Sequence, residues 1–196
     1  DQCIVEHALT YMRVYQAVSE RLSQIIDTTV LKNGPGYGLK LYVPEMVEFN
    51  NLKYMLIMDA DMIALQNIAT MYDETIDAFQ NNSDIVVGYA QEHNDANNSY
   101  YVKKSKKMHY AKPFGINTGL IFHDLQRMRT RHITSTSLLK INDEAITYAE
   151  QDVWNTYLYY HPNELYTFEC KWNVRADSGC KEAPGIYHAS RNSFLT

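Results

Sequence analysis

The stretch Tyr54-Met55-Leu56-Ile57-Met58-Asp59-Ala60-Asp61 is the most informative part of this sequence for the fold class. Its first part is an apolar run of strand length, and a run that is apolar on both faces is typical of a buried parallel strand. Two carboxylates follow at once, so the sequence predicts an acidic pair at the carboxyl end of a strand. In open α/β sheets, that edge is where ligands bind.

Helical and extended patterns alternate after this stretch. The sequence predicts a helix over 68–81, strands over 84–90 and 119–123, and a later helix in which apolar residues from Val153 to Leu158 recur at helical spacing. Residues 150–152 stand near the start of that later helix, where carboxylates suit the helix dipole. This alternation predicts an α/β sheet.

The part of the chain before residue 54 is predicted to be helical. Apolar residues three and four apart indicate an amphipathic helix over 4–26, and Asn33-Gly34-Pro35-Gly36 breaks the chain. A second helical stretch is expected over 39–49, with Pro44 in its first turn. The sequence contains no linker between domains, so we expect a single domain over 1–196.

The composition is that of a folded protein, with 45% hydrophobic and 21% charged residues among 196. A net charge of −5 argues against broad binding to nucleic acid or to anionic lipid. We interpret the lysine run Lys103, Lys104, Lys106 and Lys107 as a solvated loop. No apolar run reaches the roughly 18 residues of a membrane helix, and no signal peptide opens the chain, although an anchoring segment could precede it.

The cysteines and glycosylation sequons favour the secretory pathway. Cys170 and Cys180 are close enough in sequence to close a short loop, which leaves Cys3 over. Sequons at Asn81 and Asn97 lie in polar, turn-rich stretches. Sequons are frequent by chance, so they add little by themselves.

The acidic pair has the chemistry of a divalent cation site. Carboxylates at i and i+2 converge where the chain turns, and oxygen ligands suit Mg²⁺ or Mn²⁺ carrying a phosphate-bearing ligand. By itself an Asp-x-Asp sequence is common, and a solvated turn is the alternative. Here the apolar residues 62–65 follow directly, and burying Asp59 and Asp61 without a cation would be unfavourable. We therefore predict a metal site.

Several segments resemble motifs of glycosyltransferase family 8, the glycogenin-like retaining enzymes with a GT-A fold, and they follow one another in the family's order. The strand and acidic pair look like that family's strand and DxD motif, 113–122 looks like its Asn-Ser/Thr-Gly segment, and 150–152 looks like its Asp-Gln-Asp block. A closer similarity to animal glucoside xylosyltransferases is carried by 90–93, 126–129, 161–166, 168–173 and 179–183. The resemblance covers roughly residues 38 to 192.

The resemblance implies a set of metal and diphosphate contacts. Asp59 would contact the ribose and the metal, Asp61 would ligate the metal, and His188 would complete the protein ligands. Lys40 takes the position of a basic residue near the donor, and Arg191 would place a permanent cation near the diphosphate. Without these roles, Lys40 would be a solvated helix lysine and His188 a surface or core histidine.

The resemblance also implies which residues face the sugar. Asn117, Thr118 and Gly119 would line the donor and acceptor site. Gln151 would face the anomeric carbon with Asp152 beside it, although both could also cap a helix.

The sequence departs from the family pattern at three places. Glu150 stands for the usual Asp, and Ala189 stands for a glycine of the xylosyltransferases. The apolar strand that holds the uracil has no good match before residue 38, so the nucleotide-binding strand is expected to be missing by N-terminal truncation or lost in a variant.

These expectations together describe a GT-A-like α/β domain with a mixed central sheet. It would use Mn²⁺ or Mg²⁺ and a UDP-sugar, UDP-xylose by the nearest subfamily, and transfer the sugar with retention to a glucoside or other glycan hydroxyl, such as O-linked glucose on a protein. The resemblance to a secreted family further implies a Cys170–Cys180 disulfide and a Golgi or endoplasmic reticulum lumen. The alternatives are a catalytically inactive domain and a Mg²⁺-dependent phosphohydrolase.

Overall fold

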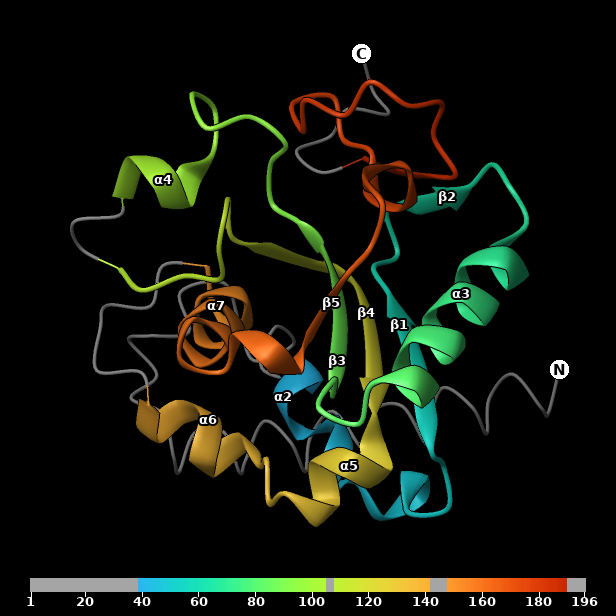
Figure 1. The fold of residues 1–196 in the computed structure, drawn as a ribbon, viewed down its shortest axis with the longest axis vertical. Coiled ribbons are helices and arrows are strands. Elements are labelled where there is room, and N and C mark those ends of the chain that lie inside the picture. The colour runs from blue at the N-terminus through green and yellow to red at the C-terminus, as the bar shows by residue number, and fades with distance from the viewer. Residues whose placement is uncertain (1–38, 105–107, 142–147, 190–196) are drawn as a thin grey trace, which may run out of the picture.

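The computed structural model describes residues 39–104, 108–141 and 148–189 (Figure 1). The helix predicted over 4–26, the break at residues 33–36 and the region before residue 38, where the nucleotide-binding strand was expected to be missing, lie outside these ranges, as do Cys3, Lys106, Lys107 and Arg191. Within them, no helix is long and apolar enough to cross a membrane.

A four-stranded mixed sheet in the order β1-β4-β3-β5 lies at the centre of the described part. Strand β4 pairs antiparallel with β1 and β3, while β3 and β5 are parallel. The bounds are β1 Tyr54–Met58, β3 Val87–Gln91, β4 Ile116–Asp124 and β5 Leu165–Thr167. The predicted α/β class with a mixed sheet is confirmed.

Strand β1 corrects one detail of the prediction. It ends before the acidic pair as expected, but it runs antiparallel to β4 and its residues are only partly buried. An apolar run indicates that other elements pack on both faces of the strand, but it does not indicate the direction of the neighbouring strand. The strands predicted over 84–90 and 119–123 are observed as β3 and the longer β4.

Helices cover both faces of the sheet. Helix α3 (Ile68–Asn81) lies on one face, and α2 (Leu39–Tyr42), α5 (Leu125–Thr130), α6 (Ser135–Ile141) and α7 (Glu150–Tyr160) pack on the other (Figure 1). Alternation along β4 supplies both cores, because Ile121 joins the α7 side while Leu120 and Phe122 join the α3 side. Helix α3 begins where the Asn67 side chain accepts the N–H of Ala69, at 3.0 Å.

The helix predicted over 39–49 is wrong in part. The structure has the single turn of α2 followed by the 3-10 turns η2 (Val43–Glu45) and η3 (Val47–Phe49). Pro44 lies in the first turn of η2, and a proline has no N–H with which to continue the preceding helix. Of the lysine run, Lys103 is exposed in the short helix α4 (Tyr100–Lys104), as expected.

A second, two-stranded sheet joins β2 (Met62–Ala64) to β6 (Ile186–His188). The antiparallel register places His188 opposite Met62. The chain therefore brings a residue near the end of the described part next to the acidic pair.

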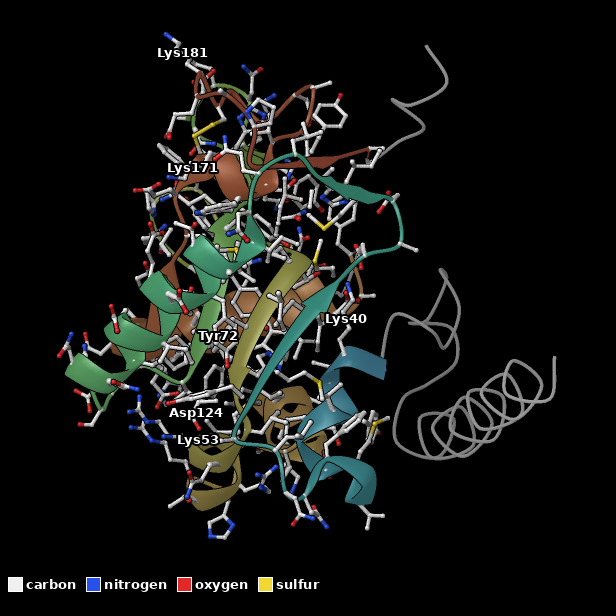
Figure 2. All side chains as sticks on the ribbon, turned by 90° about the vertical axis from the view of Figure 1, so that its right-hand side faces the viewer. Lys40, Lys53, Tyr72, Asp124, Lys171 and Lys181 are labelled. Carbon is white, nitrogen blue, oxygen red and sulfur yellow. A yellow bond between two sulfur atoms is a disulfide. The ribbon has the colours of Figure 1, made fainter. Side chains whose placement is uncertain are left out.

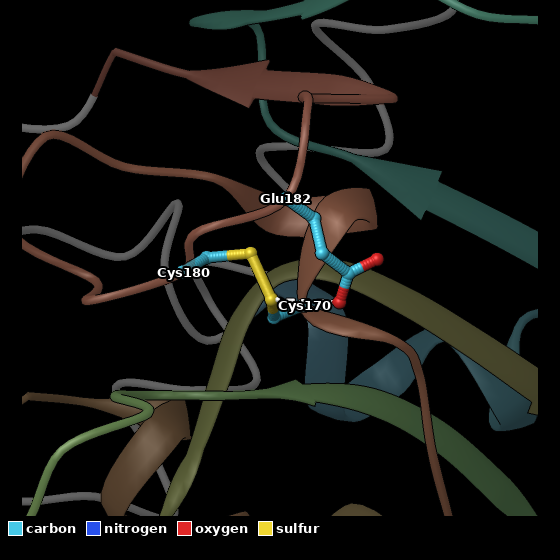
Figure 3. Close-up of side chains that lie close together, drawn as sticks. All are labelled: Cys170, Cys180 and Glu182. Carbon is cyan, nitrogen blue, oxygen red and sulfur yellow. Dashed lines mark hydrogen bonds between the residues drawn. A yellow bond between two sulfur atoms is a disulfide. The ribbon is translucent and has the colours of Figure 1, made fainter.

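The predicted disulfide between Cys170 and Cys180 is present (Figure 3). It begins at the turn η5 (Cys170–Asn173) and closes the loop that leads towards β6. The Glu182 carboxylate lies 3.3 Å from the Cys170 sulfur, but this cluster is no metal site because the two sulfurs are bonded to each other. The 3-10 turn η4 (Pro162–Glu164) completes the described elements.

Candidate metal and donor site

The backbone around the acidic pair is fixed by three hydrogen bonds. The N–H of Asp59 donates to the carbonyl of Gly119 (2.8 Å), and the N–H of Met62 donates to the carbonyl of Asp59 (3.3 Å). The N–H of Ala189 donates to the carbonyl of Asp61 (2.8 Å). The turn after β1 is thus held between β4 and the end of β6, which aims both carboxylates at one point.

Asp59, Asp61 and His188, the metal ligands that the family resemblance implies, lie close together. One ligand atom from each lies within 4.8 Å of the others, and His188 Nε2 is 3.4 Å from Asp61 Oδ1. The side chains of Asp59 and Asp61 are 34% and 49% exposed, so the expectation of a buried acidic pair is wrong. The following strand β2 is a surface strand, with Ile63 48% exposed.

His188 is the buried member of this set. Burial lowers the pKa of its imidazole, against the opposing effect of Asp61, so the neutral ring that can ligate a metal is favoured. Room for the ring comes from Gly119, since a Cβ at that position would lie 2.4 Å from His188 Cε1. Gly119 therefore makes space for the imidazole of His188.

The chemistry of these three donors fits Mn²⁺ or Mg²⁺. Two carboxylates and one imidazole form a mixed hard and borderline set that suits Mn²⁺, and Mg²⁺ prefers the oxygens. The exposed face of Asp61 leaves access for a phosphate-bearing ligand.

Lys40 lies beside the carboxyl end of β1 (Figure 2). Its ammonium is 2.6 Å from Asp59 Oδ1 and donates to the carbonyl of Thr118 at 2.7 Å. It is also 3.4 Å from Glu150 Oε1. The structure thus places Lys40 in contact with the predicted site instead of in solvent.

Glu150 is almost completely buried behind Lys40. Burial raises the pKa of its carboxyl, while the Lys40 ammonium acts in the opposite direction. The hydroxyl of Thr118 donates to Glu150 Oε1 at 3.0 Å. Thr118 therefore links the start of α7 to β4, and its side chain points to Glu150.

Gln151 is held at both ends of its amide. Its Oε1 accepts the backbone N–H of Thr118 (3.2 Å) and Nδ2 of Asn117 (3.1 Å). Its Nε2 donates to Glu92 Oε2 and to the hydroxyl of Tyr101, both at 3.2 Å. The residue predicted to face the anomeric carbon is thus a fixed amide dipole.

Asn117 occupies the centre of this hydrogen-bond network. Its Nδ2 donates to Glu92 (2.9 Å) and Gln151, and its Oδ1 accepts the N–H of Gly119 (3.0 Å) and Nδ2 of Asn173 (2.8 Å). An amide has two donor hydrogens and two acceptor lone pairs, so all four are in use. A sugar hydroxyl would have to displace one of these partners.

Asp152 has no exposed surface. It accepts the hydroxyl of Tyr101 (2.8 Å) and the backbone N–H of Tyr148 (2.7 Å), which secures the start of α7. Gly115, at a positive φ of 82°, lets the ring of Tyr101 pack against the backbone before β4. Asp152 therefore holds its neighbour Gln151 in place through Tyr101.

Three further residues belong to this network, although no role was predicted for them from the sequence. Asn173 touches both Asn117 and His188, and Glu92 accepts from Asn117 and Gln151. The buried guanidinium of Arg175 is 3.3 Å from Glu92 Oε1. Glu92 and Asn173 stand in segments that carry the family resemblance, which was the one signal available for them.

Ala189 and Arg191 complete the predicted set. Ala189 is buried, and its N–H bonds to Asp61, so the alanine in place of glycine is compatible with the turn in this structure. Arg191 lies outside the described residues, and its contact with the diphosphate stays a prediction.

Comparison with known proteins identifies similar sequences. The profile of "Glycosyl transferase family 8" matches residues 37–189. Glucoside xylosyltransferase 1 of Danio rerio is 28% identical over 82% of this chain and 44% of that protein, and its Rattus norvegicus counterpart is 25% identical over 82% and 40%. The glycosyltransferase-like protein LARGE of Caenorhabditis elegans is 27% identical over 78% of this chain and 25% of that protein. The chain thus spans less than half the length of these relatives.

Solved structures share the fold. Mouse xyloside xylosyltransferase 1 in its apo form superposes with a TM-score of 0.66, at 16% identity over 91% of this chain and 73% of that one. The galactosyltransferase LgtC in complex with donor and acceptor sugar analogs gives a TM-score of 0.60, at 13% identity over 79% of this chain and 58% of that one. These likenesses confirm the GT-A fold.

Proposed function

The chain belongs to glycosyltransferase family 8, and we propose that it carries the donor site of an enzyme that transfers xylose from UDP-xylose to a glucoside or another glycan hydroxyl. Transfer would retain the anomeric configuration and depend on Mn²⁺ or Mg²⁺. The donor and the acceptor class come from the glucoside xylosyltransferases, which are 25% and 28% identical in rat and zebrafish.

The observation that carries this proposal is the convergence of Asp59, Asp61 and His188, whose ligand atoms lie within 4.8 Å of one another. The three residues come from a strand end and from a β6 strand that is more than a hundred residues away in sequence. A family profile covers both segments, at residues 37–189. A solvated turn would not require a buried histidine next to it.

Each residue of the site would have a distinct role. Asp59, Asp61 and His188 would hold the cation, which neutralises charge on the departing diphosphate when it is bound. Lys40 would hold Asp59 in position, and Arg191 would add positive charge near the diphosphate. Gln151 would present a fixed amide dipole to the anomeric carbon, so catalysis would rest on positioning and electrostatic stabilisation.

Asn117, Thr118, Gly119 and Asp152 would act mainly by orienting these groups. Asn117 and Thr118 both bond to the Gln151 amide, and Asp152 does so through Tyr101. We further infer a secretory-pathway location, in the Golgi or the endoplasmic reticulum, because the Cys170–Cys180 disulfide persists in oxidising compartments.

A donor panel tests the proposal. The chain is incubated with Mn²⁺, a glucoside acceptor and UDP-xylose, UDP-glucose or UDP-galactose, and both UDP release and the mass and anomeric form of the product are measured. We expect an α-xylosylated product from UDP-xylose. Because the pocket must distinguish xylose from glucose by one hydroxymethyl group, the preference between them is expected to be about 10-fold to 200-fold.

Two variants separate the possible outcomes. Asp61→Asn keeps the size and removes the charge, so Mn²⁺-dependent UDP binding should disappear, whereas Asp77→Asn on the exposed face of α3 should have no effect. Equal UDP binding by the parent, Asp61→Asn and His188→Ala chains would refute the site assignment. If the parent binds no UDP, even with its natural upstream residues, the hypothesis of a catalytically inactive domain would be favoured over that of an active transferase. Release of inorganic phosphate from simple esters would instead support the phosphohydrolase.

A further inference from the structure

We propose that Asn173 is a positioning residue that fixes the tautomer of His188. Together with Asn117 it forms a relay of hydrogen bonds from the backbone of β4 to the imidazole, which leaves Nε2 unprotonated and facing Asp61. The inference rests on the proposed metal site, because an unprotonated Nε2 is what a metal ligand requires.

The polarity of the relay starts from a group that can only donate. The backbone N–H of Gly119 is 3.0 Å from one side-chain atom of Asn117, so that atom must be the amide oxygen Oδ1. The next group along, the side chain of Asn173, lies 2.8 Å from the same oxygen. Because Oδ1 cannot donate, the contacting atom of Asn173 must be its NH₂ group.

The orientation of Asn173 then determines the imidazole. With its nitrogen turned to Asn117, its oxygen Oδ1 faces His188 Nδ1 at 2.8 Å. An amide oxygen accepts, so Nδ1 must carry the hydrogen. In the neutral ring Nε2 then has a free lone pair, and it is this nitrogen that lies 3.4 Å from Asp61 Oδ1.

The other end of the relay is equally constrained. Nδ2 of Asn117 donates to Glu92 Oε2 at 2.9 Å and to Gln151 Oε1 at 3.1 Å, and Gln151 Oε1 is identified as oxygen by the backbone N–H of Thr118. Flipping the Asn117 amide would place oxygen against oxygen at both contacts and nitrogen against the N–H of Gly119. Two backbone N–H groups of β4 therefore set the direction of the network.

The packing around Asn173 supports a dedicated role. Its side chain is 2% exposed, between the buried ring of His188 and Asn117. The disulfide at Cys170 begins the same turn, and the N–H of His188 donates to the carbonyl of Val174 at 2.8 Å. Asn173 is thus held at a fixed distance from the imidazole.

The tautomer is measured directly by ¹H–¹⁵N correlation of the histidine rings in the metal-free full chain, at a pH well above the ordinary histidine pKa of about 6.5. A His188→Gln variant assigns the resonances among the 7 histidines. We expect the parent to have hydrogen on Nδ1. A ring with its hydrogen on Nε2 overturns the relay, whatever the metal affinity is.

Variants test the role of Asn173. Asn173→Leu keeps the volume but loses the acceptor, so we expect a mixture of tautomers and a Mn²⁺ affinity about 10-fold to 100-fold lower. Asn173→Asp keeps an oxygen facing Nδ1 and should retain the parent tautomer, but its second oxygen replaces the donor to Asn117 Oδ1, so the free energy of unfolding should fall. The matched control is Asn155→Leu, another buried asparagine, which bonds to the backbone of Ile116 and Gln151 but to no side chain of the relay.

The outcomes distinguish this inference from the proposed function. Parent tautomer and parent affinity in Asn173→Leu would overturn the relay, and Asn173→Ala replaces this variant if it does not fold. If the parent binds no Mn²⁺ but Asn173→Leu still loses the Nδ1 tautomer, the relay stands and the metal site fails. An equal loss of affinity in Asn155→Leu would show a general structural effect and would also overturn the assignment.

Discussion

Replacing Gly119 by alanine should disable the metal site through a single methyl group. A Cβ there would lie 2.4 Å from His188 Cε1, 2.8 Å from its Nδ1 and 3.0 Å from Asn117 Oδ1, whereas ordinary contacts begin at 3.4 Å. The imidazole would therefore have to move by about 1 Å, which is several times the roughly 0.2 Å tolerance of metal–ligand distances. We expect Mn²⁺-dependent UDP affinity to fall by at least about 10-fold to 100-fold.

The same substitution should have a moderate effect on stability. Adding a methyl group to a packed site typically costs about 1 to 3 kcal/mol. Gly88→Ala is the matched control, since its Cβ would lie 2.8 Å from Phe168 Cζ in the apolar core on the α3 side. Both variants should lose similar free energy of unfolding in denaturant titrations, but Gly88→Ala should keep the affinity of the parent.

The assay is calorimetric titration of UDP with and without Mn²⁺, on a parent chain that binds. The reasoning is refuted if Gly119→Ala loses stability yet binds Mn²⁺ and UDP as tightly as the parent. That result would mean that the ring of His188 can move without consequence, and hence that it is not a ligand.

Three other perturbations test the surrounding structure. Lys40→Met leaves the buried Glu150 carboxyl without its cation at 3.4 Å, so the free energy of unfolding should fall by about 2 kcal/mol. Most of this loss should vanish in the double variant with Glu150→Gln, and additive losses in denaturant titrations would contradict the coupling. Replacing Cys170 and Cys180 by serine should lower the free energy of unfolding by about 2 to 3 kcal/mol for this short loop, and a reductant should then have no further effect. A serine variant as stable as the oxidised parent would contradict a stabilising disulfide. Burial lowers the pKa of His123 to about 3, below the value of about 6.5 in the unfolded chain. Its contribution to the free energy of unfolding is therefore complete above pH 6.5 and is lost as the pH falls toward 3, by up to about 1.4 kcal/mol per pH unit. His123→Phe should lack this loss, and parallel curves of stability against pH for the two proteins would refute the prediction.

Local patterns in the sequence were sufficient for several elements of the fold. The helix over Ile68–Asn81 and the start of α7 at Glu150 follow from apolar spacing and polar residues near their ends, which depend on neighbours a few residues away. The acidic pair after Met58 was likewise predicted from its local pattern, and the pairing of Cys170 with Cys180 was predicted from the short loop together with the family resemblance. Hydrophobic periodicity, turn residues and short loops are properties of the chain itself.

The direction of β1 was decided by the tertiary structure. Strand pairing depends on which distant segment lies alongside, and β4 runs opposite to β1 at a separation that no local pattern records. The partial exposure of Asp61 follows in the same way from the position of β2 at the surface.

The candidate site shows the same division. The sequence, through its family resemblance, placed Asp59, Asp61 and His188 in one metal site, and the structure brings their ligand atoms together. The network around Asn117 was not predictable, because Glu92 and Asn173 are 25 and 56 residues from it in the chain. The direction of each hydrogen bond depends on which buried donor contacts which acceptor, and these contacts form only with the tertiary structure.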